Sequence, residues 1–440
     1  MSVLPSSELD LRGRVGRRPR GSAAPSAGAS PLPALGRADR WLRRRLIDRL
    51  TALDLDGVDL VDGDGVHAFG GEQSLDPARD ADRSQAAIAV QDPKFYRSVA
   101  LGGSLGFGRA YVDGEWTTAD LPTLLQRLAR ATVGRSTADG PASWPARIVG
   151  SVRKLGRRNT RSGSRRNIHA HYDLSNEFFA LFLDESMTYS CGIFESPETT
   201  LAEAQYAKYD RIAQGLQLTA GDHVIEIGCG WGGFAEHAAS RYGCRVTGIT
   251  ISEEQFQFAR RRIAAAGLAD RVEIQLCDYR DVQGQFDKLA SIEMIEAVGH
   301  EFLPTFFAKC SSLLKRDGLM MLQTITIPDQ RYQQYRRGVD FIQEYIFPGG
   351  HVPSLGAICQ AVAESTDLQL LELADFAGDY ARTLLSWRES CHTNARPIAA
   401  LGFDQRFQRT WDYYLSYCAA GFMERHIGLA QILFAKPKAR

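Results

Sequence analysis

The segment VIEIGCGWGGFAEHAA, residues 224–239, constrains the fold more strongly than any other part of the sequence. An apolar run leads into a cluster of glycines, and the pattern of an amphipathic helix follows. Gly228, Gly230 and Gly232 allow the backbone to turn sharply from a strand into a helix and to approach a ligand closely. The segment therefore predicts a strand, a nucleotide-binding turn and a helix, in that order.

Strand and helix patterns alternate along the second half of the chain. Short apolar runs indicate five buried strands: HVIEIG, CRVTGIT, VEIQLC, DKLASIEMI and GLMMLQTITI. Two amphipathic stretches between them, FAEHAASRYG and EEQFQFARRRIAAAG, indicate helices. This alternation predicts an α/β fold with a doubly wound parallel sheet, whose ligands lie beyond the carboxyl ends of the strands.

Length and local composition divide the chain into regions. A chain of 440 residues is too long for one typical domain. Residues 1–40 are rich in Arg and contain a low-complexity tract, so we expect a disordered basic tail. Residues 41–150 mix apolar runs with Gly and Asp turns and predict a small α/β or α+β domain that associates with lipid or substrate, and residues 151–168 predict a basic linker. The regular pattern of residues 169–440 predicts the main domain.

Residues 41–50, WLRRRLIDRL, have the pattern of an amphipathic helix. It suits an anionic lipid surface, and it equally suits a helix packed on its own domain with solvated arginines. The sequence has no run of 18 apolar residues and no signal-peptide pattern, so we expect a cytoplasmic protein with peripheral contact at the inner membrane face. The eight cysteines are scattered, which argues against a metal site or a disulfide framework. A net charge of zero gives no reason to expect nucleic acid.

The glycine turn is compatible with two classes of cofactor. Gly228, Gly230 and Gly233 also fit the dinucleotide pattern G-x-G-x-x-G, which requires an acid about 20 residues later, at the end of the second strand. Residues 248–251 there are Gly, Ile, Thr and Ile, whereas Asp278 follows the third strand. Together with E-x-G-x-G-x-G in the turn, this arrangement resembles class I S-adenosylmethionine-dependent methyltransferases.

Motifs on both sides of the turn narrow the resemblance. They are HYDLSNEFFALFLDESMTYSCGIF, VIEIGCGWGG, GITISEEQ, IEMIEAVGHE, FIQEYIFPGGHVPS and DYARTLLSW. In this order they resemble the cyclopropane-fatty-acyl-phospholipid synthase family, and SLGFGRAYVDGEW resembles the N-terminal domain of its longer bacterial members. The resemblance implies a Rossmann-like class I methyltransferase domain with a mostly parallel seven-stranded sheet, preceded by a small N-terminal α+β domain. It also implies a homodimer that uses S-adenosylmethionine to alkylate the cis double bond of unsaturated acyl chains in membrane phospholipids.

The resemblance also assigns site residues. Around the cofactor it places Tyr189, Ser190, Gly228, Gly230, Gly232, Thr250, Gln255, Asp278 and Tyr279. Family members hold a bicarbonate ion, thought to act as the base, and four of its five partners match Cys191, Glu296, Ile325 and Tyr380. The fifth partner, a His, is replaced by Gln323, which can neither act as a base nor become a cation. This replacement weakens the case for bicarbonate in this chain.

The residues themselves suit an alkylation that passes through a cation. An alkene has no ionisable proton for a base to remove, so the electrophilic methyl group of the sulfonium must start the reaction. Glu296 is expected to end the fourth strand and Gln323 to lie in the fifth, so both can face the pocket. Negative charge and aromatic faces there would stabilise a carbocation on the acyl chain. His300 is expected to be a structural hydrogen-bonding residue.

Alternatives remain open for the product and for the substrate. Proton loss from the transferred methyl group with ring closure gives a cyclopropane, whereas a prior hydride shift gives a methylene branch, which a reductase partner could reduce. The stretches EMIEAVG and LQTIT resemble the methylene-forming branch of the family. The remaining alternatives are a methyltransferase for a soluble small molecule and a lipid-binding protein with a decayed cofactor domain.

Overall fold

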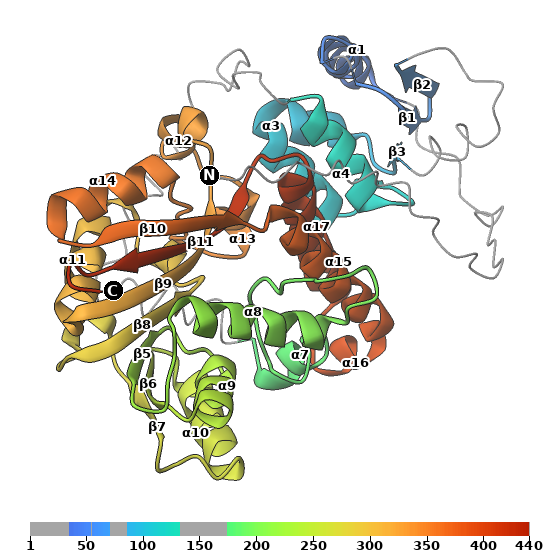
Figure 1. The fold of residues 1–440 in the computed structure, drawn as a ribbon. Coiled ribbons are helices and arrows are strands. Elements are labelled where there is room, and N and C mark those ends of the chain that lie inside the picture. Colours follow the sequence, from blue (N-terminus) through green and yellow to red (C-terminus); the bar gives the residue numbers. More distant parts are fainter. Residues whose placement is uncertain (1–34, 54, 71–85, 133–173, 440) are drawn as a thin grey trace.

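The structure is a computed structural model that describes residues 35–53, 55–70, 86–132 and 174–439. It consists of a small N-terminal part and a larger α/β domain (Figure 1). Most of the predicted tail and the whole predicted linker, residues 151–168, lie outside the described residues. Within the described ranges, every helix is too short or too polar to span a bilayer.

The larger domain is built on a seven-stranded sheet. Its strands are β5 (His223–Ile227), β6 (Arg245–Thr250), β7 (Val272–Leu276), β8 (Phe286–Ile292), β9 (Leu314–Thr326), β10 (Gln369–Asp375) and β11 (Gly428–Ala435). They follow the order β10-β11-β9-β8-β5-β6-β7, and β11 alone runs antiparallel to its neighbours. The strand order reverses between β5 and β8, which places the carboxyl end of β5 at the topological switch point. The predicted Rossmann-like, mostly parallel fold is therefore confirmed.

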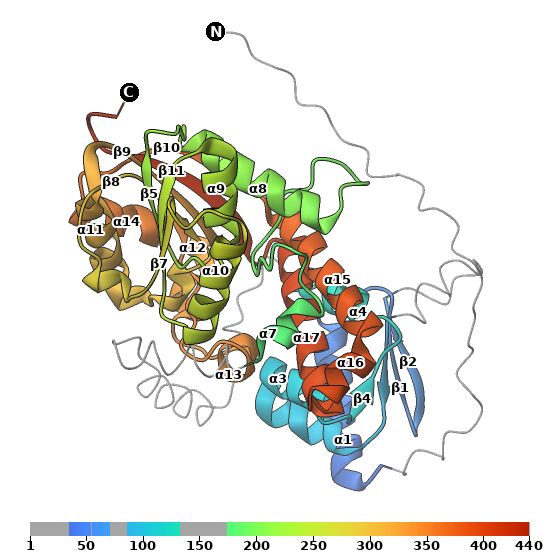
Figure 2. The ribbon, with the colours of Figure 1, turned by 90° about the horizontal axis from the view of Figure 1, so that it is seen from below.

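Helices cover both faces of this sheet (Figure 2). On one face lie α8 (Leu201–Gly215), α9 (Gly233–Tyr242) and α10 (Glu253–Ala265), and on the other α11 (Leu303–Leu313) and α14 (Leu355–Ser365). Successive strand residues point to opposite faces, so Val224 packs in one core with Phe234, while Ile225 packs in the other with Phe306. The two predicted helices correspond to α9 and α10, and the central strands β5 and β6 are buried on both sides.

The described residues of the N-terminal part form a small mixed sheet and three helices. The sheet has the order β2-β1-β3-β4, with β1 (Val58–Asp62), β2 (Gly65–Phe69), β3 (Ala87–Val90) and β4 (Trp116–Thr117). The helices are α1 (Arg37–Thr51), α3 (Lys94–Val112) and α4 (Leu121–Arg130). α1 begins at Arg37, so it starts before the predicted amphipathic helix and takes in the last residues assigned to the tail. α3 is bent at Gly103, whose φ is +55°.

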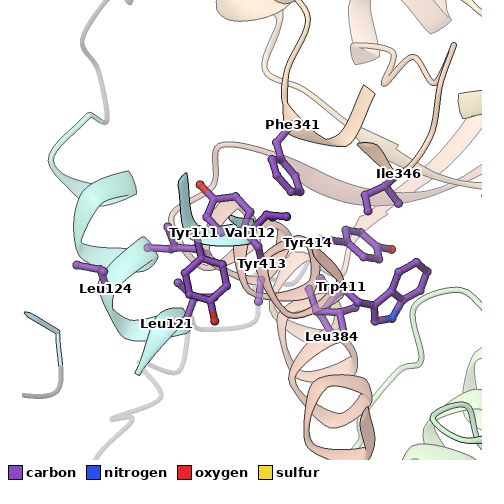
Figure 3. Close-up of a cluster of buried hydrophobic side chains, with 14 of the residues drawn as sticks. Tyr111, Val112, Leu121, Leu124, Phe341, Ile346, Leu384, Trp411, Tyr413 and Tyr414 are labelled. Carbon is purple, nitrogen blue, oxygen red and sulfur yellow. The ribbon is translucent and has the colours of Figure 1, made fainter. Parts of the chain in front are cut away.

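The remaining described elements include those that join the two parts, α13 (Phe341–Tyr345) and α17 (Gln405–Met423). The others are α7 (Asn176–Ala180), α12 (Asp329–Tyr335), α15 (Ala377–Thr393), α16 (Ala395–Ala400) and the 3-10 helices η2 (Tyr279–Asp281), η3 (Ile295–Ala297) and η4 (His300–Phe302). α17 packs against α3, α4 and α15, and Figure 3 shows Tyr111 beside Tyr413 in this core, with their ring centroids 5.7 Å apart. The Tyr111 hydroxyl donates to Asp412 of α17 at 2.6 Å. The N-terminal part is thus held against the main domain by a shared core.

Candidate active site

Three glycines form the turn between β5 and α9. Gly228, Gly230 and Gly232 have φ values of +88°, +51° and +85°, a region that favours glycine. A Cβ added at Gly228 would lie 2.7 Å from Cγ of Met294, whereas one at Gly230 would meet nothing within 4 Å. Gly228 and Gly230 line a cavity. Gly232 does not; a Cβ there would lie 3.1 Å from Cβ of Ala259, so this glycine allows α9 to pack on α10.

A large cavity runs from the glycine turn into the N-terminal part. Its volume is about 2480 Å³, whereas small-molecule sites typically measure ~300–1,000 Å³. At one end it is lined by the residues of the turn and by the carboxyl ends of β6 and β7. At the other end it is lined by apolar side chains of α1 and α3, among them Leu46, Val99 and Leu105. The cavity therefore extends from the main domain into the N-terminal part.

The predicted cofactor residues on β6 and β7 meet at the turn end of the cavity. The Thr250 hydroxyl donates to Oε1 of Gln255 at 2.9 Å, and both side chains are buried. Asp278 follows β7 as predicted, and its carboxylate accepts hydrogen bonds from the guanidinium of Arg280 at 2.8 and 2.6 Å. Tyr279 lies beside them on the cavity wall. The prediction did not include Arg280, which neutralises Asp278.

The segment before α8 supplies Tyr189 and Ser190 to the same cavity. The hydroxyls of Tyr189 and Tyr414 are 2.9 Å apart, which ties the segment to α17. Oγ of Ser190 accepts a hydrogen bond of 2.8 Å from Nζ of Lys208, a fully buried lysine on α8. Burial lowers the pKa of Lys208 to about 8. This ammonium group therefore places a positive charge behind the cavity wall below that pH.

The turn end of the cavity fits S-adenosylmethionine. Glu226, at the end of β5, is buried, and its Oε2 has no hydrogen-bond partner among the described protein atoms. Burial raises the pKa of Glu226 to about 8. An orphaned carboxylate oxygen suits a ligand that brings hydroxyl donors and positive charge, and S-adenosylmethionine carries both. The open space at Gly230 allows such a ligand to approach the backbone.

Three of the residues assigned to bicarbonate converge instead on Glu293, which directly follows β8. Oε1 of Glu293 accepts hydrogen bonds from the backbone N–H of Cys191 at 2.9 Å and from Nε2 of Gln323 at 2.8 Å. Oε2 accepts a hydrogen bond from the hydroxyl of Tyr380. Burial raises the pKa of the Cys191 thiol well above its ordinary value, so this residue contributes its backbone rather than a thiolate.

The other two predicted residues form a second carboxylate site. Glu296 was expected to end a strand, but β8 ends at Ile292 and Glu296 lies in η3. The strand is shorter because the backbone turns at Glu293, where φ is +49°. Oε1 of Glu296 accepts hydrogen bonds from the backbone N–H of Ile325 at 2.6 Å and from the hydroxyl of Thr324 at 2.9 Å. Its Oε2 is buried and has no hydrogen-bond partner among the described residues.

The two carboxylates titrate differently. Burial and the adjacent charge of Glu293 raise the pKa of Glu296 to about 8. Burial also raises the pKa of Glu293, but hydrogen bonds from Tyr380, Cys191 and Gln323 oppose this rise. Three donors to Glu293, and the unpartnered Oε2 of Glu296, favour the negative charge on Glu293 and the proton on Glu296.

Sequence reasoning missed Glu293 and Lys208. The stretch SIEMIEA contains two acids three residues apart, and the family resemblance assigned a role only to Glu296. A charged residue that directly follows a buried strand was an available signal for Glu293. His300, predicted to be structural, lies 2.8 Å from the hydroxyl of Tyr332 through Nδ1.

Comparisons with known proteins agree with this geometry. A family model described as mycolic acid cyclopropane synthetase matches residues 159–432. The tuberculostearic acid methyltransferase UfaA1 of Mycobacterium tuberculosis is 39% identical over 417 residues, which cover 92% of this chain and 94% of that protein. The cyclopropane-fatty-acyl-phospholipid synthase of Escherichia coli K12 is 37% identical over 356 residues, which cover 80% of this chain and 88% of that protein.

A solved structure from the same family is also similar to this chain. The crystal structure of mycolic acid cyclopropane synthase CmaA1 complexed with SAH and CTAB superposes with a TM-score of 0.58 at 32% identity. The match covers 62% of this chain and 98% of that one. Because the family model spans more than half of the chain, the protein belongs to the mycolic acid cyclopropane synthetase family, and it is an S-adenosylmethionine-dependent methyltransferase that modifies unsaturated lipid chains.

Proposed function

We propose that the protein alkylates the cis double bond of unsaturated acyl chains that are esterified in phospholipid. The observation that carries this proposal is the cavity of about 2480 Å³ that joins the glycine turn to the apolar faces of α1 and α3. A cofactor occupies only part of such a volume, and the remaining apolar passage suits a long hydrocarbon chain. A methyltransferase for a soluble small molecule would not need this passage.

The chain's own residues fit a reaction through a carbocation. When bound, S-adenosylmethionine supplies an electrophilic methyl group. Glu293 and Glu296 place carboxyl groups at the cavity wall, and Tyr380, stacked on Phe422 with ring centroids 4.5 Å apart, adds an aromatic face. Negative charge and π-faces stabilise a developing cation most strongly where water is excluded. These groups would therefore act on the cation that methyl transfer leaves on the acyl chain.

A methylene-branched product is a second candidate. Gln323 in place of His, and the match over 92% of the chain to a tuberculostearic acid methyltransferase, favour it. This product requires a 1,2-hydride shift before proton loss, and a separate reductase partner would then be needed to form a methyl branch. Both products share the first chemical step.

Expression in a bacterium that lacks its own cyclopropane synthase tests the function. Mass spectrometry of the membrane fatty acids is expected to show a gain of one CH₂ on unsaturated chains, and the fragmentation pattern separates ring from branch. A folded, expressed protein that leaves the fatty acids unchanged would refute the proposal. Liposome flotation addresses the small-molecule alternative, because an enzyme for a soluble substrate should not float.

We further propose that α1 and the bend in α3 form the lipid-facing mouth of the cavity. Trp41 and Leu101 both line it and are 58% and 76% exposed. α1 also carries the exposed residues Arg44, Arg45 and Arg49, of which Arg45 and Arg49 line the cavity. Apolar groups that insert into a bilayer beside cations that meet anionic headgroups are typical of peripheral membrane binding.

The double variant Trp41→Asp, Leu101→Asp is expected to lower binding to anionic phospholipid vesicles by at least about tenfold. It replaces inserted apolar surface by charge that the headgroups repel. Co-sedimentation with vesicles measures the effect. Leu401→Asp is the matched control, because Leu401 is 43% exposed and lies away from the cavity. Equal losses in both proteins would contradict the assigned mouth.

A further inference from the structure

We propose that the carboxylate of Glu293 is the base that removes a proton from the alkylated acyl chain, in place of a bound bicarbonate ion. This inference rests on the proposed function. Glu293 lines the cavity, and the residue after it, Met294, packs against Gly228 of the glycine turn. The carboxylate therefore lies where the acyl chain and the cofactor methyl group would meet.

The hydrogen-bond donors that would hold bicarbonate are already bonded to carboxylates of the chain. The backbone N–H of Cys191, the amide of Gln323 and the hydroxyl of Tyr380 all donate to the Glu293 carboxylate. The backbone N–H of Ile325 donates to Glu296 at 2.6 Å. Each of these positions, which the family resemblance assigns to the ion, is engaged by a carboxylate of the chain itself. The residues present thus do not fit bicarbonate.

The side-chain amide of Gln323 is oriented so that it donates a hydrogen bond to the Glu293 carboxylate. Its Oε1 accepts a hydrogen bond of 2.8 Å from Nε2 of Gln431, which fixes the amide so that Nε2 faces Glu293. Oε1 of Gln431 in turn accepts from Nε of Arg211 at 3.0 Å. A chain of donors therefore runs from a guanidinium to the Glu293 carboxylate. This orientation explains why a neutral amide at position 323 is sufficient.

The backbone at Glu293 is shaped to deliver this side chain. Its φ of +49° is uncommon for a residue other than glycine. Its N–H donates to the carbonyl of Gln323 at 2.8 Å, which anchors the turn to β9. Strained backbone of this kind is concentrated at functional sites. The turn directs the carboxylate toward the Cys191 segment and the cavity, rather than along the sheet.

Two ionisable groups that can carry charge face Glu293: the ammonium of Lys208 on α8 and the carboxyl of Glu296 in η3. The neighbouring side chains of Tyr380 and Cys191 are neutral, because burial raises the pKa of both well above their ordinary values. Burial raises the pKa of Glu293, and the hydrogen bonds from Tyr380, Cys191 and Gln323 oppose this rise. These three donors favour the anion on Glu293, whereas Oε2 of Glu296 has no hydrogen-bond partner among the described residues.

The step balances in atoms and charge. Methyl transfer forms a C–C bond, breaks the S–C bond and leaves a cation on the acyl chain. Glu293 then forms an O–H bond to a proton of the transferred methyl group. The electron pair of the broken C–H bond closes the ring, or forms the methylene double bond after a hydride shift. The carboxylate becomes a neutral acid, the hydrocarbon becomes neutral, and the acid later releases its proton to solvent.

The test uses the full-length enzyme with vesicles of unsaturated phospholipid and S-adenosylmethionine in CO₂-depleted buffer. The wild type is expected to turn over equally with and without added bicarbonate. Glu293→Gln should lower formation of ring or methylene product by about 100-fold, within the range for loss of a general base. Its cofactor affinity, measured by calorimetry, should stay within about threefold. Glu364→Gln, on the exposed face of α14, is the matched control and should behave as wild type.

The variant Glu293→Gly distinguishes a catalytic base from a residue that only maintains the structure. Glycine tolerates the positive φ, so the fold should hold, and the donors of Cys191, Gln323 and Tyr380 then face an empty space. Formate or bicarbonate is expected to restore turnover of this variant by at least about tenfold. Neither anion should restore Glu293→Gln, whose amide fills the space.

Several results would overturn the assignment. They are stimulation of the wild type by bicarbonate, turnover of Glu293→Gln above a tenth of wild type, and a folded Glu293→Gly protein that neither anion rescues. A wild type that forms no alkylated acyl chain would instead refute the proposed function, and the base assignment with it.

Discussion

Gly230→Val is expected to lower the affinity for S-adenosylmethionine by at least about 100-fold, equivalent to about 2.7 kcal/mol. A Cβ at Gly230 would meet nothing within 4 Å because it projects into the cavity. The branched side chain would therefore fill the space through which a cofactor approaches the turn. Isothermal titration calorimetry on the purified protein measures the effect.

The loss of stability that backbone strain causes has to be separated from the loss of affinity that the blocked cofactor space causes. Gly230 has a φ of +51°, and a β-branched residue in the left-handed region costs about 1–2 kcal/mol of stability. Gly402→Val is the matched control, because Gly402 has a φ of +94°, equally open space and an exposed position away from the cavity. Both variants should melt at lower temperature, but only Gly230→Val should lose the cofactor. Equal affinities would show that the cofactor does not approach the turn.

Much of the main domain was predictable from local patterns. The strands from β5 to β9 are apolar runs because both faces of the sheet are buried, and periodicity alone identifies such runs. β10 was not predicted from its residues, because it is an edge strand whose Leu370, Leu371 and Leu373 remain exposed. β11 inserts antiparallel between β9 and β10, a pairing between distant segments that no local pattern records.

The site was predictable only in part. The motifs identified Cys191, Gln323 and Tyr380, and the structure brings these residues together. They could not show that Glu293 is the shared acceptor, because that depends on a left-handed turn directly after β8. Two acids three residues apart look equivalent in sequence, and only the backbone conformation separates their partners. The hydrogen bond from Arg280 to the Asp278 carboxylate likewise depends on the local turn at η2.

Glu296→Gln is expected to lower turnover by about 100-fold at pH 9 but by less than about tenfold at pH 6.5. The pKa of Glu296 is raised to about 8, so its second negative charge becomes available to a cation only as the pH rises. Wild-type turnover should therefore increase more steeply through pH 8 than that of the variant, which retains Glu226 and Lys208. The amide oxygen of Gln can still accept the hydrogen bonds from Ile325 and Thr324, so cofactor affinity should change little.

The pH dependence of the free energy of unfolding gives an independent check on the pKa of Glu296. The direction of this dependence follows from proton linkage. A carboxyl whose pKa rises from 4.5 to about 8 on folding contributes stability below pH 4.5, and this contribution is lost as the pH rises toward 8. Gln at this position does not titrate, so Glu296→Gln should gain stability relative to wild type over this interval, by up to a few kcal/mol. Glu226 and Lys208 also titrate near pH 8, but both proteins contain them, so the difference isolates Glu296. Denaturant unfolding at pH 5, 7 and 9 measures this difference; a difference that does not shift in favour of the variant between pH 5 and pH 9 would show that folding does not raise the pKa of Glu296.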